Sequence, residues 1–223
     1  MNGIRELKED LWLLKNKMRT YRNWWASTSL TPYDKSSVES IEVQKEQIIV
    51  NAKNGKEYTF RYEENYRDFL FTIAEIFIWK TYNPPHSIAN RDVVDIGAGI
   101  GDSSIWFAAK GARKVYAYDI DPLRCKEAMK NIKFNNMQNK IKLFNHPYKN
   151  LPLKNAILKV DCDGCEYKLF DKIDLRQFDD VVMEYHKGYE PISTILQKNG
   201  FNITIKHAKP FSKSGYIKAT RAR

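Results

Sequence analysis

The stretch that most constrains this chain is a glycine-rich run at residues 93–104, VVDIGAGIGDSS. Val93, Val94 and Ile96 form the continuous apolar pattern of a strand that is buried on both faces. Glycines follow at every second position, and they allow a tight turn in which the backbone approaches a ligand closely. A helical pattern begins directly after the turn. This order of strand, turn and helix predicts a site for a nucleotide-containing cofactor.

The spacing of the glycines separates two kinds of cofactor site. The dinucleotide-binding fingerprint needs its third glycine one residue later, where this chain has an aspartate. The observed pattern, DxGxGxG, resembles the first motif of the Rossmann-like S-adenosylmethionine-dependent methyltransferases. The resemblance implies S-adenosyl-L-methionine as the cofactor and a set of cofactor-binding residues in and before the turn: Asp95, Gly97, Ala98, Gly99 and Gly101.

A second short apolar strand is expected at residues 114–118, and Asp119 follows it eighteen residues after Gly101. A carboxylate in this place can accept hydrogen bonds from both ribose hydroxyls of the cofactor. Ile120 comes next, and we expect it to contact the cofactor as well.

The chain then predicts a helix over residues 122–135 and a third strand over residues 141–144. In the resembled class the residue after this strand contacts adenine, which implies such a role for Asn145, with an ordinary turn residue as the alternative. The apolar side of the helix is expected to consist of Leu123, Ala128, Met129 and Ile132.

The fourth expected strand carries the string ILKVDCDGCE, residues 157–166. It resembles the signature of the FkbM family of methyltransferases, in which a Lys-Ile-Asp-Val-Glu-Gly-Ala-Glu-like run ends this strand. Asp163 stands where that family has glutamate. The positions that match the signature are Lys159, Asp161, Gly164 and Glu166.

The fifth expected strand, residues 181–186, ends in Glu184, Tyr185 and His186, and it again resembles the FkbM pattern of a glutamate with a nearby histidine. The resemblance covers roughly residues 60–220. After the second strand the chain departs from the family, because Asp119 begins an Asp-Ile-Asp-Pro sequence where FkbM proteins usually have Glu-Pro. This end is more similar to RNA-modifying methyltransferases.

Methyl transfer to a hydroxyl requires that the acceptor is aligned and loses one proton. His186 is the first candidate for the base, because a neutral imidazole accepts a proton near neutral pH. Asp161 and Glu184 are the alternative bases or the groups that orient the base. The competing interpretations are a strand-capping histidine and a structural or cofactor-contacting Asp161. Glu166 is expected in the first turn of a helix, where a carboxylate favours the helix dipole.

Strand candidates alternate with helical stretches after residue 90, which predicts an α/β fold with a parallel sheet and right-handed crossovers. The resemblance implies the Rossmann-like methyltransferase fold, with a mostly parallel seven-stranded sheet and helices on both faces. Residues 86–223 are expected to form this domain. Residues 1–85 are expected to form a helical and β-hairpin extension that packs on it.

Within the extension, apolar residues at three- and four-residue steps over residues 4–21 predict an amphipathic helix. This helix covers the sheet or, alternatively, forms a homodimer seam or a surface for membrane or RNA. Strands are expected at 41–50 and 57–62, with the turn pair Asn54-Gly55 between them, and a helix is expected at 64–80. Charges interrupt the apolar residues of this last helix, so no membrane span is predicted.

The three cysteines agree with a reducing, cytoplasmic location and with no disulfide. Cys162 and Cys165 form a CxxC pair, but the chain has no second pair and only four histidines. The sequence therefore predicts neither a metal centre nor a redox site at this pair. The acidic residues at the strand ends leave a hard divalent ion as the alternative.

The net charge of +10 is concentrated near the C-terminus. Residues 191–223 contain no acidic residue and seven Lys or Arg. The connection after the sixth strand is expected at the carboxyl edge of the sheet, so Lys206, Lys209 and Lys213 would attract an anionic partner such as RNA or a phosphorylated acceptor. A solvated basic tail is the alternative.

The FkbM resemblance implies a methyltransferase that acts on a hydroxyl of a small or glycan-like acceptor, and the basic C-terminal region is consistent with an anionic group on that acceptor. The alternatives are a tRNA or RNA methyltransferase that uses the basic C-terminal region and a binding protein of the same fold without catalysis. Fold alone does not decide between them.

Overall fold

The computed structural model describes residues 38–44, 46–61, 66–208 and 213–222. The amphipathic helix expected at residues 4–21, its self-association seam and Lys209 lie outside these described residues.

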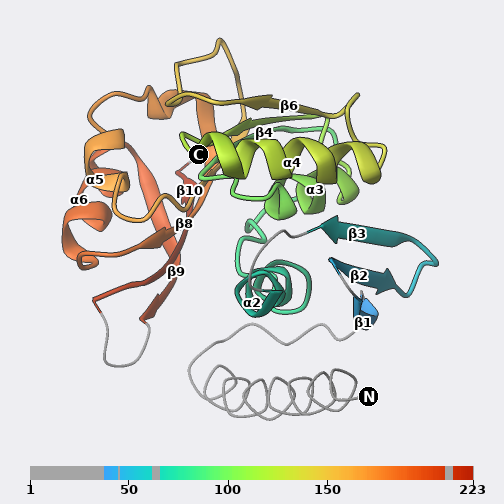
Figure 1. The fold of residues 1–223 in the computed structure, drawn as a ribbon. Coiled ribbons are helices and arrows are strands. Elements are labelled where there is room, and N and C mark those ends of the chain that lie inside the picture. Colours follow the sequence, from blue (N-terminus) through green and yellow to red (C-terminus); the bar gives the residue numbers. More distant parts are fainter. Residues whose placement is uncertain (1–37, 45, 62–65, 209–212, 223) are drawn as a thin grey trace.

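The main sheet contains seven strands in the order β6-β5-β4-β7-β8-β10-β9 (Figure 1). The five strands from β6 to β8 are parallel, and β10 runs antiparallel between β8 and β9. This arrangement confirms the predicted mostly parallel, Rossmann-like sheet. The strand bounds are β4 Asp92–Ile96, β5 Lys114–Tyr118, β6 Ile141–Phe144, β7 Ala156–Val160, β8 Phe178–Tyr185, β9 Phe201–Ala208 and β10 Gly215–Arg221.

Helices cover both faces of this sheet. Val93 and Val94 are neighbours on β4 and are both fully buried, yet they belong to different cores, because successive residues of a strand point to opposite faces. None of the described helices is long and apolar enough to cross a membrane. Their bounds are α2 Tyr66–Phe77, α3 Asp102–Ala109, α4 Pro122–Phe134, α5 Glu166–Leu169, the 3₁₀ turn Leu175–Gln177 and α6 Glu190–Lys198.

A small antiparallel sheet precedes the main one (Figure 1). It consists of β1 Val38–Gln44, β2 Gln47–Ala52 and β3 Glu57–Arg61. The single strand predicted at 41–50 is wrong, because the chain reverses before β2, where Glu46 has a left-handed φ of 66°. The predicted turn at Asn54-Gly55 is confirmed between β2 and β3.

The small sheet and α2 share a hydrophobic core with the methyltransferase-like domain. Ile48, Phe60 and Ile73 are buried in the same cluster as Val93 of the main sheet. Asn131 of α4 and Asn135, which caps the C-terminal end of α4, add hydrogen bonds to the β3 backbone. The described part of the extension is therefore fixed to the domain, whereas the boundary at residue 85 stays a prediction.

The predicted apolar side of α4 is partly wrong. Ala128 and Ile132 are buried, but Leu123 and Met129 are 70% and 64% exposed. The inner face of the helix also takes the fully buried Asn131, whose side chain bonds to the backbone of β3 and of the glycine loop. Polar tertiary contacts, which an apolar pattern does not reveal, set the rotation of this helix.

Candidate cofactor and active site

The glycine-rich run forms the loop between β4 and α3. Gly97, Gly99 and Gly101 all have left-handed φ values, of 76°, 52° and 85°. A Cβ on Gly97 would lie 1.6 Å from the carbonyl oxygen of Asp161, so that position accepts only glycine. A Cβ on Gly99 would meet no atom within 4 Å. The loop is therefore packed tightly against the end of β7 at Gly97 and is open at Gly99, where a ligand has room.

Asp119 lies beside the open part of this loop. Its carboxylate accepts the backbone N–H of Gly99 at 2.8 Å and that of Asp121 at 2.9 Å. Each carboxylate oxygen retains a second lone pair, which a ribose hydroxyl can use. The loop and the carboxylate expected to hold the sugar are thus adjacent, as the sequence predicts.

Two further predicted contacts gather around Asp119. Ile120 exposes 73% of its surface, which is unusual for a large apolar residue and suits an aromatic base. Asn145 donates from Nδ2 to the carbonyl oxygen of Asp119 at 3.1 Å. Open space, a carboxylate and an exposed apolar side chain together fit the adenosine part of S-adenosyl-L-methionine.

Asp95 supports the loop from below. It is fully buried and accepts the hydroxyls of Ser103 at 2.7 Å and Ser104 at 2.6 Å. Its other oxygen pairs at 2.9 Å with the ammonium of Lys159, which also donates to the carbonyl of Gly97 at 2.6 Å. Burial lowers the pKa of Lys159, but the nearby carboxylates of Asp95, Asp161 and Asp102 together outweigh burial, so the pKa is raised. Asp95 therefore holds the loop, and a contact between Asp95 and the cofactor stays a prediction.

Ala98 has a similar supporting place. Its side chain is buried, and its N–H donates to the carbonyl of Tyr118 at 3.1 Å, beside the corresponding bond from Gly97 at 2.9 Å. These two bonds fix the start of the loop to the end of β5.

The glycine loop at residues 97–101 and Asp119 are called the cradle below. Asp161 follows β7 and connects this cradle to a second group of side chains. Its N–H donates to the carbonyl of Ile96 at 2.9 Å, and its carboxylate accepts the hydroxyl of Tyr82 at 2.9 Å. Tyr82 is buried, comes from the connection after α2 and lies over Lys159. Sequence reasoning missed Tyr82, because no local motif marks a contact across 79 residues.

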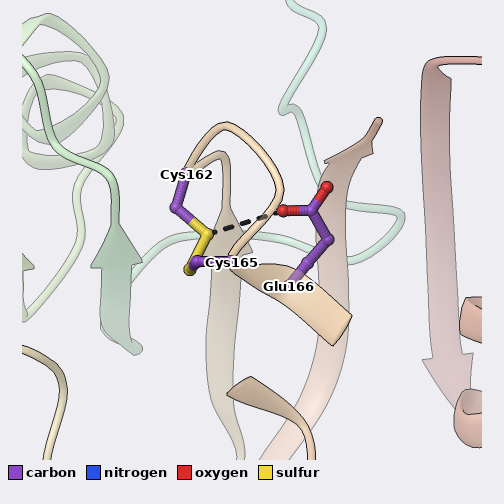
Figure 2. Close-up of side chains that lie close together, drawn as sticks. All are labelled: Cys162, Cys165 and Glu166. Atoms are coloured by element: carbon purple, nitrogen blue, oxygen red, sulfur yellow. Dashed lines mark hydrogen bonds between the residues drawn. A yellow bond between two sulfur atoms is a disulfide. The ribbon is translucent and has the colours of Figure 1, made fainter. Parts of the chain in front are cut away.

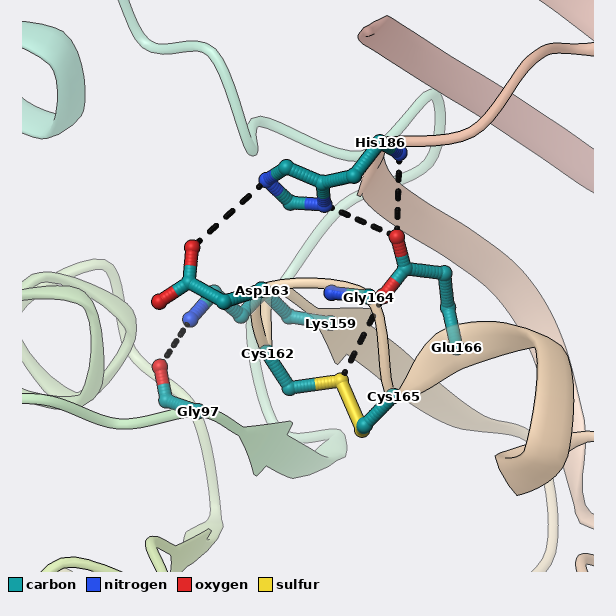
Figure 3. Close-up of a disulfide and its surroundings, with 8 residues drawn as sticks. All are labelled: Gly97, Lys159, Cys162, Asp163, Gly164, Cys165, Glu166 and His186. Carbon is teal, nitrogen blue, oxygen red and sulfur yellow. Dashed lines mark hydrogen bonds and ion pairs between the residues drawn. A yellow bond between two sulfur atoms is a disulfide. The ribbon is translucent and has the colours of Figure 1, made fainter.

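His186, directly after β8, is held by Glu166. One oxygen of Glu166 accepts the backbone N–H of His186 at 3.0 Å and lies 2.8 Å from its Nδ1 (Figure 3). Glu166 is fully buried, while 24% of the His186 side chain is exposed. Because a carboxylate only accepts hydrogen bonds, Nδ1 carries a proton and Nε2 is the atom that gains or loses one. Nε2 lies 3.5 Å from Glu184 and 3.7 Å from Asp163.

The contact between His186 and Glu166 shifts the pKa of both residues. The hydrogen bond to Glu166 raises the pKa of His186 above its ordinary value, against an opposing effect of burial. Burial raises the pKa of Glu166, but the hydrogen bonds from His186 and from the backbone lower this pKa by more, so the net pKa is below the ordinary value. Glu166 lies in the first turn of α5, as predicted, and its carboxylate also binds His186 and the N–H of Gly164.

The loop between β7 and α5 contains a disulfide between Cys162 and Cys165, which corrects the expectation of no disulfide (Figure 2). The Cα atoms are 5.4 Å apart, a separation that a CxxC turn readily reaches. The sulfur of Cys162 lies 3.6 Å from Glu166. Cys125 is the remaining cysteine, and it is free and buried.

Asp161, Asp163 and His186 also bring potential metal ligands within 4.8 Å of one another. Their side chains already contact one another or Tyr82, Glu166 and Glu184. Acidic groups at a surface gather without an ion as well, so this cluster assigns no metal, and the metal-free site stays a prediction.

Of the three lysines expected near the carboxyl edge, Lys213 is the one whose side chain the structure describes. Gly215 pairs with Tyr185, and the carbonyl of Lys213 accepts the N–H of Gly188 at 2.8 Å, so the exposed Lys213 is near the end of β8. Lys206 pairs with Ile217 in the sheet, and its side chain is not among those described.

A sequence model of the ribosomal protein L11 methyltransferase family, PrmA, matches residues 84–162, which hold the cradle. The chain is 43% identical over 58 residues to the L11 methyltransferase of Carboxydothermus hydrogenoformans, which is 26% of this chain and 19% of that protein. It is 39% identical over 75 residues to a tRNA (guanine(37)-N(1))-methyltransferase of Methanocaldococcus jannaschii, which is 34% of this chain and 19% of that protein. The matches span only about a fifth of these two relatives.

Solved structures share the fold. A tRNA methyltransferase of M. jannaschii aligns over 80% of this chain and 58% of its own, with a TM-score of 0.54 and 21% identity. Magnesium protoporphyrin IX methyltransferase of Synechocystis PCC 6803 with bound SAH aligns over 72% of this chain and 89% of its own, with a TM-score of 0.51 and 20% identity. The chain has the class I methyltransferase fold. These similarities support S-adenosyl-L-methionine as the cofactor, as the glycine motif predicts.

Proposed function

We propose that the protein is an S-adenosylmethionine-dependent methyltransferase. The observation that carries this proposal is the contact between Gly97 and the carbonyl of Asp161. This contact places the cradle and the loop at residues 161–166 at one edge of the sheet. Glu166 at the end of this loop holds His186. Asp119, Ile120, Asn145 and the glycine loop would hold the cofactor, which supplies an electrophilic methyl group when it is bound.

The residues beyond the cradle suit a hydroxyl acceptor. Nε2 of His186 takes the hydroxyl proton, and the buried carboxylate of Glu166 holds the Nδ1–H and stabilises the imidazolium that forms. Asp161 and Glu184 would orient the acceptor or the base. The transfer needs no redox step and no covalent intermediate on the protein, so alignment and one proton transfer are the work of the protein.

For the acceptor we propose a hydroxyl of a small or glycan-like molecule, as the FkbM resemblance implies. An anionic group on it would be drawn to the basic connection that contains the exposed Lys213.

RNA is the second candidate acceptor. A tRNA methyltransferase is among the relatives of this chain, and basic residues flank the active edge. Binding to RNA would weaken steeply as salt rises, because each neutralised phosphate releases counterions.

The test is incubation of the full chain with methyl-labelled cofactor and fractionated cell extract. Label in glycans or small hydroxyl compounds, lost in His186→Ala and kept in His86→Ala, supports the first acceptor class. Label in RNA, with a salt dependence that Lys213→Glu reduces, supports the second. A folded protein that binds the cofactor and transfers no label would contradict the enzyme and favour a non-catalytic binding protein.

A further inference from the structure

We propose that Cys162 and Cys165 form a reversible redox site, reduced by a dithiol, that controls the order of the active-site loop at residues 161–166. The catalytic meaning of this loop rests on the proposed function. The redox site itself rests on the disulfide and its surroundings, which do not depend on methyl transfer.

The disulfide is placed where a change in it reaches the active site. In the chain it lies between Asp161, which touches the cradle, and Glu166. Figure 3 shows that Glu166 in turn holds His186. Neither Cys162 nor Cys165 is buried, so a reductant can approach the sulfurs. By contrast, Cys125 is buried in α4 and has no disulfide partner.

The backbone inside the disulfide ring is strained. Asp163 and Gly164 are both left-handed, with φ values of 51° and 99°. Glycine adopts this conformation freely, but a residue with a Cβ pays for it in conformational free energy. The side chain of Asp163 is fully exposed and makes only a 3.7 Å ion pair, so it holds the turn weakly. The covalent ring closes the turn together with a hydrogen bond from the N–H of Cys165 to the carbonyl of Cys162 at 3.2 Å, and it is the covalent constraint on Asp163.

The turn is coupled to the candidate base through a shared carboxylate. One oxygen of Glu166 accepts the N–H of Gly164 at 2.9 Å and lies 3.6 Å from the sulfur of Cys162. The other oxygen binds His186 twice. A half-cystine sulfur has no hydrogen to donate, whereas a Cys162 thiol can donate to Glu166. Reduction therefore changes both the turn and the environment of the carboxylate.

The exchange follows ordinary thiol chemistry. A thiolate of the reductant attacks one sulfur of the pair, the S–S bond breaks, and the other cysteine leaves as a thiolate that takes a proton from water. The second thiol of the reductant, as a thiolate, then attacks the reductant's own sulfur in the mixed disulfide, so that the remaining protein cysteine leaves as a thiolate and takes a proton, and the reductant is released as a disulfide. Two electrons and two protons pass to Cys162 and Cys165, and the reductant is oxidised by the same amount.

The test compares the full chain, with S-adenosyl-L-methionine present, in oxidised and reduced glutathione and with a reduced thioredoxin-type dithiol. Alkylation after denaturation counts one thiol per chain in the disulfide form and three in the dithiol form. We expect the folded protein to convert reversibly between the two. A pair that the dithiol reduces only after unfolding would overturn the proposal.

Hydrogen exchange then measures the loop. We expect the amides of Gly164 and His186, which bind Glu166, to exchange at least about fivefold faster in the dithiol form, because the ring no longer holds the turn. Equal exchange in the two forms would contradict control of the loop.

Two variants complete the design. The double variant Cys162→Ser, Cys165→Ser should exchange as the dithiol form does under all conditions, while Cys125→Ser should keep the response to the reductant. Methyl transfer is measured separately in each state. A redox response without methyl transfer would refute the proposed function only, and methyl transfer without a redox response would refute the redox site only.

Discussion

Gly97 lies against the carbonyl of Asp161 so closely that a Cβ would stand 1.6 Å from the oxygen. The contact joins the end of β4 to the end of β7, two neighbouring parallel strands. The contact explains how the cradle and the loop at residues 161–166, which holds His186 through Glu166, form one continuous edge of the sheet.

We expect Gly97→Ala to destabilise the fold by about 3 kcal/mol or more, because backbone atoms must shift and the left-handed φ remains. Gly111→Ala is the matched control. It has a φ of 93°, but its Cβ would make only ordinary contacts at 3.7 Å or more, so it should cost about 1–2 kcal/mol. Urea unfolding measures both, and equal losses would contradict the tight contact.

Because Lys159 is paired with the buried Asp95, its loss should destabilise the protein far more than the loss of an exposed lysine. Lys159→Met leaves Asp95 without its cation in a fully buried place, so we expect a loss of about 3–5 kcal/mol in unfolding free energy. Lys114→Met removes a lysine whose bond to Asn139 is exposed and should cost less than about 1 kcal/mol. If the two variants unfold alike, Lys159 does not support the loop.

Glu166→Gln removes the charge that favours the His186 imidazolium, so the pKa of His186 should fall. A base loses activity as pH falls through its pKa. The acid limb of the rate profile should therefore move to lower pH in this variant, while the maximal rate falls. NMR titration of the imidazole provides a readout that does not depend on turnover. An unchanged pKa of His186 in this variant would contradict the claim that Glu166 stabilises the imidazolium.

The same pair makes stability depend on pH. Because the pKa of His186 is raised in the fold, its stabilising contribution is complete below the ordinary value of 6.5 and is lost as pH rises through the raised pKa. The pKa of Glu166 is lowered, so its contribution is present above the ordinary value of 4.5 and is lost as pH falls through the lowered pKa. The difference in unfolding free energy between the protein and His186→Gln should shrink on the alkaline side. A constant difference would contradict the raised pKa.

Much of the cradle could be predicted from the sequence, because the ends of parallel strands meet at one edge and each carries its own signal. The glycine loop, Asp119 and Asn145 gather there as expected. Tyr82 and the pairing of Glu166 with His186 were missed, because such contacts depend on how distant elements pack. The disulfide was missed because a single CxxC does not reveal its redox state. The exposure of Leu123 was missed because polar contacts of Asn131 set the rotation of α4.

The most direct test of the central claim is calorimetric titration of the full chain with S-adenosyl-L-methionine. We predict saturable binding that Asp119→Ala weakens by about tenfold or more, because this variant removes the carboxylate that holds Gly99 and that we expect to bind the sugar. Asp121→Ala, which removes only the cap of α4, should cost about 1 kcal/mol of stability and leave the affinity unchanged. A folded protein that gives no heat with this cofactor or its demethylated product, or an affinity that Asp119→Ala does not alter, would contradict the account.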